Sequence, residues 1–265
     1  MPLNELIHKK INLPLTISAL LFFLFPWSVN SLAGDNNKPV INSSTQKFTL
    51  KLGATRVIYN PDSAGASILV QNEQDYPILV QSKVFSDDKV TAAPFVITPP
   101  LFRLEKEQQS RLRIIRTGGT FSEDKETLQW ICVKGIPPKE GDAWLEDKDG
   151  NSPKPGNMAN LKVQISISNC IKLFIRPSKL KGNSFDVASS VIWSKNNDKL
   201  EIKNPTPFYM NISSVMVDGS VVNGVEFVAP FSSRSFDLPN KSPKKVQWKI
   251  IGDHGGESMP FYSEL

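Results

Sequence analysis

Apolar and polar residues alternate along much of this chain, and the clearest alternation runs over residues 161–167. Lysine, glutamine and serine lie between aliphatic residues there. Because successive side chains of a β-strand point to opposite faces, this spacing places the aliphatic side chains on one face of a strand. The apolar character continues past Cys170 through residues 171–175, so the pattern predicts a long strand. The aliphatic residues are Leu161, Val163, Ile165 and Ile167.

Shorter β-rich stretches precede and follow this strand, separated by turn residues such as proline, glycine, asparagine and aspartate. Many short strands without an amphipathic helix favour an all-β fold built from immunoglobulin-like β-sandwiches. The stretches lie near residues 48–52, 56–59, 67–71, 78–85, 111–115 and 128–133, and again near 191–193, 200–202, 210–217, 236–238 and 246–251.

Pro177 is the best candidate for the boundary between two such sandwiches, because proline cannot continue a central strand. We therefore expect one immunoglobulin-like domain over residues 34–176, which includes the long strand, and a second over residues 177–265. Residues 139–160 are charged and rich in glycine, proline and asparagine, which is typical of a long loop between two strands.

Residues 1–33 have the order of a secretory signal peptide. Two lysines precede an apolar run over residues 11–25, and a small-residue cleavage pattern follows at residues 31–33. A retained membrane anchor is the alternative, but prolines interrupt the run, and it is short for a span that needs ~20 residues. We expect the mature protein to begin near Gly34 and to be exported to the periplasm.

Export changes the interpretation of the two cysteines, Cys132 and Cys170. Two thiols in an oxidising compartment usually pair, and such a disulfide would stabilise the fold by roughly 4 kcal/mol. A redox pair is the weaker alternative, because the C-x-x-C spacing is missing. The formal net charge is +5. The basic residues are scattered without interleaved aromatic residues, so we expect no nucleic-acid partner.

Catalytic chemistry has little support in the sequence. His254 is the one histidine left after signal removal, and its glycine neighbours are typical of a turn. The motifs of zinc proteases, serine hydrolases, P-loop enzymes and dinucleotide-binding enzymes are missing. We therefore expect no enzyme activity, no cofactor, no metal site and no small-molecule substrate.

The alternating strand supports a binding hypothesis in place of catalysis. Its aliphatic face either packs inside its own sandwich or lies exposed on an edge strand. An exposed apolar edge promotes aggregation unless another chain pairs with it, and such pairing is the mechanism of β-strand addition. The charged loop before the strand favours the exposed alternative.

Four motifs now resemble those of the periplasmic chaperones of chaperone–usher pathways, the PapD-like family. They occur in the family's order and span essentially the mature chain. The two cysteines flanking a long loop, with an extended N-terminal segment, resemble the long-loop branch, which serves thin non-pilus adhesins and capsule-like fibres. The motifs are residues 98–105 (TPPLFRLE), 136–138 (IPP), 171–177 (IKLFIRP) and 204–209 (NPTPFY).

The resemblance implies two immunoglobulin-like domains joined at an angle, with a cleft between them, and it implies roles for particular residues. Two cleft cations would anchor the C-terminal carboxylate of a bound subunit, although each alone also fits an ordinary surface charge. Alternation puts Lys172 and Ile167 on opposite faces, which a bulge near Asn169 or Cys170 would reconcile. The implied sets are the anchor Arg56 and Lys172, the donor strand Leu161, Val163, Ile165 and Ile167, the N-terminal augmenting strand Phe48, Leu50 and Leu52, and the interdomain charge cluster Glu126, Arg176 and Asp253.

The function implied by the resemblance is that of a periplasmic chaperone. It would bind a fimbrial or capsular fibre subunit, donate the strand that the subunit lacks, and deliver it to an outer-membrane usher. The free chaperone is expected to cover its own donor strand in a homodimer. The alternatives are a two-domain immunoglobulin-like adhesin or receptor fragment and a secreted hydrolase on a β-sandwich.

Overall fold

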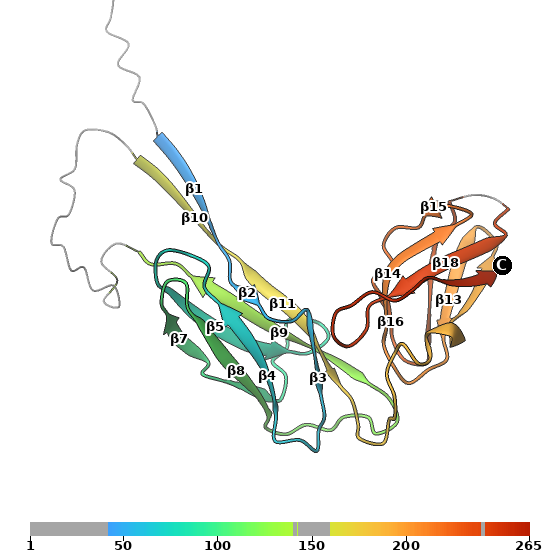
Figure 1. Ribbon diagram of the computed structural model, residues 1–265, viewed down its shortest axis with the longest axis horizontal. Coiled ribbons are helices and arrows are strands. Elements are labelled where there is room, and N and C mark those ends of the chain that lie inside the picture. Colours follow the sequence, from blue (N-terminus) through green and yellow to red (C-terminus); the bar gives the residue numbers. More distant parts are fainter. Residues whose placement is uncertain (1–41, 140–141, 143–159, 240–241) are drawn as a thin grey trace, which may run out of the picture. The chain divides into compact units, whose positions relative to one another are not determined.

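The computed structural model describes residues 42–139, 142, 160–239 and 242–265, and of residues 42–48 and 160–164 it describes the backbone alone (Figure 1). The expected signal peptide and nearly all of the expected loop over 139–160 lie outside these residues. No helical segment in the described part of the chain has the length and hydropathy that crossing a bilayer requires.

The first sandwich consists of two sheets that enclose one apolar core. Alternate residues of facing strands supply the core, for example Ile68 and Val70 from one sheet and Leu173 and Ile175 from the other. The first sheet has the order β3 (Arg56–Tyr59), β11 (Ser168–Ile175), β9 (Thr127–Ile136), β5 (Ile78–Phe85) and β7 (Leu101–Leu104), and the second has the order β2 (Lys51–Leu52), β4 (Ala66–Gln71), β8 (Gln109–Arg116) and β6 (Phe95–Thr98).

The second sandwich has its own apolar core, in which the rings of Trp193 and Trp248 lie 5.7 Å apart. Two separate cores confirm the expected all-β class with two sandwiches. One sheet has the order β12 (Ile192–Asn196), β13 (Lys199–Asn204) and β17 (Ser232–Asp237), and the other has the order β15 (Ser220–Val221), β14 (Met210–Val217), β18 (Lys245–Ile250) and β19 (Phe261–Glu264), with β16 (Phe227–Val228) also paired to β14; a short 3-10 helix, η1 (Ala188–Ser190), precedes β12.

Two further strands form a separate two-stranded ribbon outside both sandwiches. Strands β1 (Asn42–Phe48) and β10 (Asn160–Ser166) lie side by side and pair in parallel, with Asn42 opposite Asn160 and Phe48 opposite Ser166 (Figure 1). Each strand continues into the first sandwich, β1 towards β2 and β10 towards β11.

The long strand is interrupted at Ile167, which lies between β10 and β11. A bulge near Asn169 or Cys170 would have reconciled the faces of Ile167 and Lys172, but the register of β11 contains none. Strand β11 pairs with β9 without a shift, from Ser168 opposite Lys134 onward to the end of the strand. The change in pairing therefore falls before β11, where the ribbon joins the sandwich.

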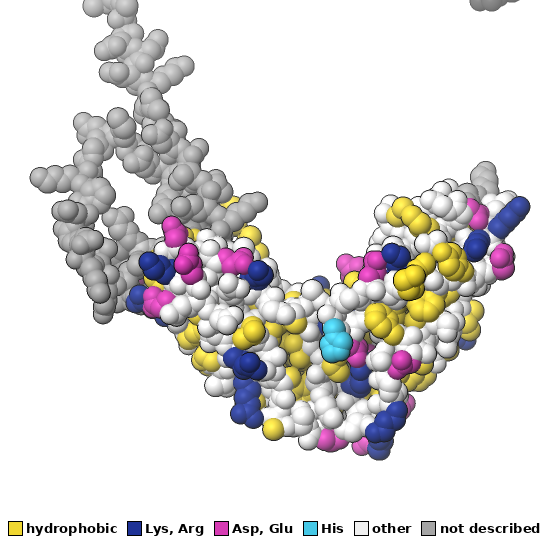
Figure 2. Space-filling view, viewed as in Figure 1, with side chains coloured by type: hydrophobic (Ala, Val, Ile, Leu, Met, Phe, Trp, Pro, Cys, Tyr) yellow, Lys and Arg dark blue, Asp and Glu magenta, His cyan; other side chains and the backbone are white. Residues whose placement is uncertain are grey.

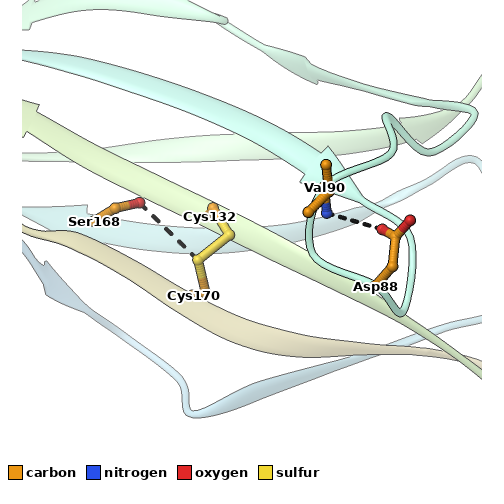
Figure 3. The surroundings of a disulfide bond; sticks show 5 residues. All are labelled: Asp88, Val90, Cys132, Ser168 and Cys170. Atoms are coloured by element: carbon orange, nitrogen blue, oxygen red, sulfur yellow. Dashed lines mark hydrogen bonds between the residues drawn. A yellow bond between two sulfur atoms is a disulfide. The ribbon is translucent and has the colours of Figure 1, made fainter.

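The expected disulfide is confirmed. Cys132 of β9 and Cys170 of β11 are direct partners in the antiparallel register, and their sulfur atoms are bonded (Figure 3). The bond therefore links two adjacent strands that are separated in the sequence by residues 137–167. Ser168 Oγ lies 4.0 Å from Cys170 Sγ at the start of β11.

Candidate functional site

Two cations, Arg56 and Lys172, lie side by side on the first sandwich. Strands β3 and β11 pair in parallel, and these residues are direct partners in the register. The next residue of each strand, Val57 and Leu173, points into the first core. Alternation therefore directs both cationic side chains to the opposite face of the sheet, towards the second sandwich.

The second sandwich provides a hydrogen-bond acceptor for each cation. Arg56 Nη1 donates to the carbonyl oxygen of Ile251 at 3.2 Å, and Lys172 Nζ donates to Asn211 Oδ1 at 2.8 Å. Lys172 Nζ also lies 4.7 Å from the centre of the Phe227 ring. Arg56 is only 8% exposed, and its Nε has no hydrogen-bond partner within the described residues.

Burial and mutual repulsion make both positive charges costly to hold. Burial lowers the pKa of Lys172 to about 8, and the charge of Arg56 acts in the same direction, while Glu226 opposes it. Burial also lowers the pKa of Arg56, which the charge of Asp253 opposes. Two partly dehydrated cations side by side favour an anion, because charge-assisted hydrogen bonds are the strong class and guanidinium fits a carboxylate.

A cavity gives access to one of these cations. Arg56 borders a space of about 560 Å³ whose other walls include Ser67 of the first sandwich and His254 of the second. On the face shown in Figure 2, basic and acidic side chains are interspersed over both sandwiches. The described basic side chains therefore form no continuous basic surface on this face.

A charge cluster joins the sandwiches close to this pair. Arg176 Nε donates to Glu126 Oε1 at 2.7 Å, and its Nη1 donates to Asp253 Oδ2 at 2.6 Å. Glu126 is 2% exposed, and its second oxygen accepts the backbone N–H of Tyr209 at 2.7 Å. Burial raises the pKa of Glu126, an effect that the charge of Arg176 opposes. The structure thus brings together all three residues of the expected interdomain cluster.

An apolar interface cluster, which sequence reasoning missed, lies on the same face of the first sandwich. It contains buried Leu128, Trp130 and Phe174, against which Tyr209 and Phe227 of the second sandwich pack. The ring centres of Phe174 and Tyr209 lie 5.2 Å apart, and those of Tyr209 and Phe227 lie 5.8 Å apart. A sequence signal for this cluster does exist. Strands β9 and β11 carry apolar residues on both faces, which indicates that both faces are covered.

The residues of the expected donor strand divide into two groups. The side chains of Leu161 and Val163 lie outside the described residues, although the backbone of β10 is described. Ile165 is 42% exposed, and Ile167 is half-buried. The exposed aliphatic side chain at Ile165 contrasts with the fully buried Leu173 and Ile175 further along the same run.

The N-terminal augmenting strand needs correction. We expected Phe48, Leu50 and Leu52 to act together beside the donor strand. Only Phe48 belongs to β1, and its side chain lies outside the described residues. Leu50 is 2% exposed and packs in the first core, while Leu52 belongs to β2, which pairs with β4 of the other sheet. The chain changes sheets between these residues, which period-two alternation does not reveal.

Among the described residues, no group of three histidine, cysteine, aspartate or glutamate side chains has an arrangement that could hold a metal ion. His254, the histidine singled out from the sequence, lies in the turn after Gly252, whose backbone N–H and carbonyl oxygen bond to Gly256 and Gly255 respectively.

Two protein-family models together match most of the chain. Residues 49–181 match the PapD N-terminal domain of pili and flagellar-assembly chaperones, and residues 186–262 match the C-terminal domain of the pili assembly chaperone PapD. The chaperone protein AfaB of Escherichia coli is 54% identical over 206 residues, which are 78% of this chain and 83% of AfaB.

Two solved structures are similar in fold and sequence. The Escherichia coli chaperone DraB is 52% identical with a TM-score of 0.73, and the match covers 84% of this chain and 100% of DraB. The SafB chaperone of Salmonella enterica, solved in complex with the SafA pilin, is 47% identical with a TM-score of 0.75, and the match covers 85% of this chain and 100% of that one.

Proposed function

Because this chain belongs to the PapD-like family of pilus-assembly chaperones, we propose that it binds a fimbrial or capsular fibre subunit in the periplasm and delivers it to an outer-membrane usher. The match to SafB, a chaperone solved with a bound pilin, supports the subunit as partner. The proposal includes no catalytic step and no cofactor. Export would depend on the signal peptide over residues 1–33, and the two domains would meet at Pro177.

The observation that carries the proposal is the paired cation site. Arg56 and Lys172 are register partners, Arg56 is buried and Lys172 is partly buried, and the acceptors that the described residues offer them are neutral. A subunit's C-terminal carboxylate would supply the missing negative charge.

Strand addition would follow from the position of β10. In the two-stranded ribbon, β10 pairs with β1 along one edge, and no other strand in the described ranges pairs with its second edge. A subunit that lacks a strand would pair with this second edge. Aliphatic side chains such as Ile165 would fill its open groove, so backbone bonds would give affinity and alternate side chains would give specificity. The extended ribbon favours the long-loop branch, which serves thin fibres.

The charge cluster would hold the two sandwiches in the arrangement that binding needs. Glu126 contributes to it from the first sandwich, Asp253 from the second, and Arg176 from the connection between them. Removing one partner from such a cluster leaves a buried charge without its counter-charge, at a cost of ~3–5 kcal/mol. The cluster is therefore a structural clamp in this proposal.

Co-expression tests the function. The chain is produced in the periplasm with fibre subunits encoded beside it, and wild type is compared with Lys172→Ala in a pull-down. Lys203→Ala is the matched control, because Lys203 is an exposed lysine of β13 in the second sandwich. We expect a soluble one-to-one complex with wild type and the control, and its loss with Lys172→Ala. A wild-type chain that brings down no subunit would overturn the proposal.

A further inference from the structure

Both cations of the anchor are held by neutral acceptors from the other sandwich. Arg56 donates to the backbone carbonyl of Ile251, and Lys172 donates to the side-chain carbonyl of Asn211. Within the described part of the chain, neither cation forms an ion pair with a carboxylate. The two positive charges are therefore positioned by these acceptors without being neutralised by them.

The two acceptors are themselves joined. Ile251 N–H donates to the backbone carbonyl of Asn211 at 2.7 Å, so the acceptors lie opposite each other on neighbouring chain segments, as the two cations do. Asn211 is buried, and its Nδ2 faces the carbonyl of Tyr209 at 3.4 Å. Because lysine can only donate, the oxygen of the Asn211 amide must face Lys172.

We propose that Asn211 is a positioning residue for the carboxylate anchor, an inference that rests on the proposed function. Its neutral oxygen holds the ammonium group of Lys172 beside Arg56 and leaves the positive charge available for the subunit. An aspartate of nearly the same shape would pair with Lys172, cancel its charge and repel an incoming carboxylate. The site therefore requires a neutral acceptor, such as the amide of Asn211, in place of a carboxylate.

Asn211 is in turn coupled to the clamp between the sandwiches. Glu126 accepts the N–H of Tyr209, two residues before Asn211, and Glu126 is held by Arg176. The anchor is therefore complete only when the two sandwiches are docked, because its cations come from one and its positioning acceptors from the other. Binding of the subunit's carboxylate would therefore depend on how the two sandwiches are docked.

The pKa of Lys172 in the free protein reports on this contact directly. The charged groups that act on it are Arg56 and Lys89, which lower its pKa, and Glu226, which raises it. Asn211→Asp adds a negative charge at hydrogen-bond distance and should raise the pKa of Lys172 by more than about one unit. Asn211→Leu removes the acceptor that stabilises the ammonium group and should lower it. Lysine NMR during a pH titration measures both shifts.

Subunit binding is the second readout. Both Asn211 variants should bind the co-expressed subunit at least about tenfold more weakly than wild type. Asn196→Asp, which adds the same charge at an exposed position of β12, should change neither the binding nor the pKa of Lys172. Circular dichroism and thermal unfolding identify any variant that fails to fold. If Asn211→Leu does not fold, Asn211→Asp decides alone.

The outcomes separate the two proposals. An unchanged pKa of Lys172 in Asn211→Asp, or subunit binding equal to wild type in that variant while Lys172→Ala fails to bind, would overturn the role of Asn211 alone. A wild-type chain that binds no subunit would overturn the proposed function, and the NMR titration would still decide whether Asn211 positions Lys172.

Discussion

Lys172 carries its charge in surroundings that disfavour it. Its ammonium group is partly buried, lies beside a guanidinium group, and contacts one amide oxygen and one aromatic face. Such a group favours binding of an anion, because a nearby negative charge offsets the cost of dehydration and the repulsion from Arg56. The same surroundings make the residue sensitive to pH near neutrality.

Raising the pH should have opposite effects on binding and on stability. The pKa of Lys172 is lowered to about 8 in the folded free protein, whereas an unfolded chain has a lysine pKa of about 10.4. Between these values the unfolded state binds more protons, so this residue makes the free protein more stable as the pH rises. A bound carboxylate favours the charged amine, so affinity for the subunit should fall as the pH rises above about 8.

Denaturant unfolding and subunit titration across this pH range measure the two effects, and Lys172→Met is the control that should lose both. The interpretation fails if wild type and Lys172→Met show the same pH dependence of affinity.

At the residue scale, the sequence was sufficient for some assignments and not for others. The resemblance to the PapD-like family implied roles for Arg56, Lys172, Glu126, Arg176 and Asp253, and the structure brings these residues into two adjoining groups. Asn211 had no such signal. Its role depends on a contact between strands of different sandwiches, and no local pattern encodes which residue docks against Lys172.

Strand β10 of the two-stranded ribbon and the sandwich strand β11 differ in what covers their aliphatic side chains. The chain is nearly continuous from β10 into β11, yet Ile165 is 42% exposed whereas Leu173 is fully buried in the first core. Burial of one aliphatic side chain is worth about 1.5–3 kcal/mol. In Leu173 that free energy is already used for folding, whereas in Ile165 part of it remains available for a partner.

Two substitutions in this run should therefore separate folding from binding. Ile165→Thr keeps a β-branched residue, so the free energy of unfolding should change by no more than about 0.5 kcal/mol, while affinity for the subunit should fall roughly tenfold. Leu173→Ala should lower the free energy of unfolding by ~2–5 kcal/mol. Urea unfolding and subunit titration measure the two quantities, and loss of stability in Ile165→Thr with unchanged affinity would contradict the assignment.

At the element scale, strand positions followed well from alternation, but the pairing of strands did not. The stretch over residues 48–52 looked like one strand because every second residue is apolar. The structure divides it, since Leu50 enters the core and β2 pairs with β4. Alternation fixes which residues share a face, and the choice of neighbouring strand depends on contacts far away in the sequence.

At the scale of the whole molecule, the proposed clamp, anchor and donor strand are physically connected. The clamp of Glu126, Arg176 and Asp253 and the apolar interface cluster both join the two sandwiches, and the anchor draws its cations from one and its acceptors from the other. The ribbon is continuous with β11, which also carries Lys172, so one strand run connects the anchor to the donor residues. A subunit fixed by its carboxylate at Lys172 would thus lie in a defined register along β10.

The central claim is that the paired cations bind the subunit's C-terminal carboxylate. The most direct measurement is calorimetric titration of the subunit's C-terminal peptide, with a free carboxylate or a C-terminal amide, against wild type and Lys172→Ala. We expect the amide to bind wild type at least about tenfold more weakly than the free acid, and Lys172→Ala to show a much smaller difference between the two peptides. Equal affinity of wild type for the acid and the amide would contradict the claim.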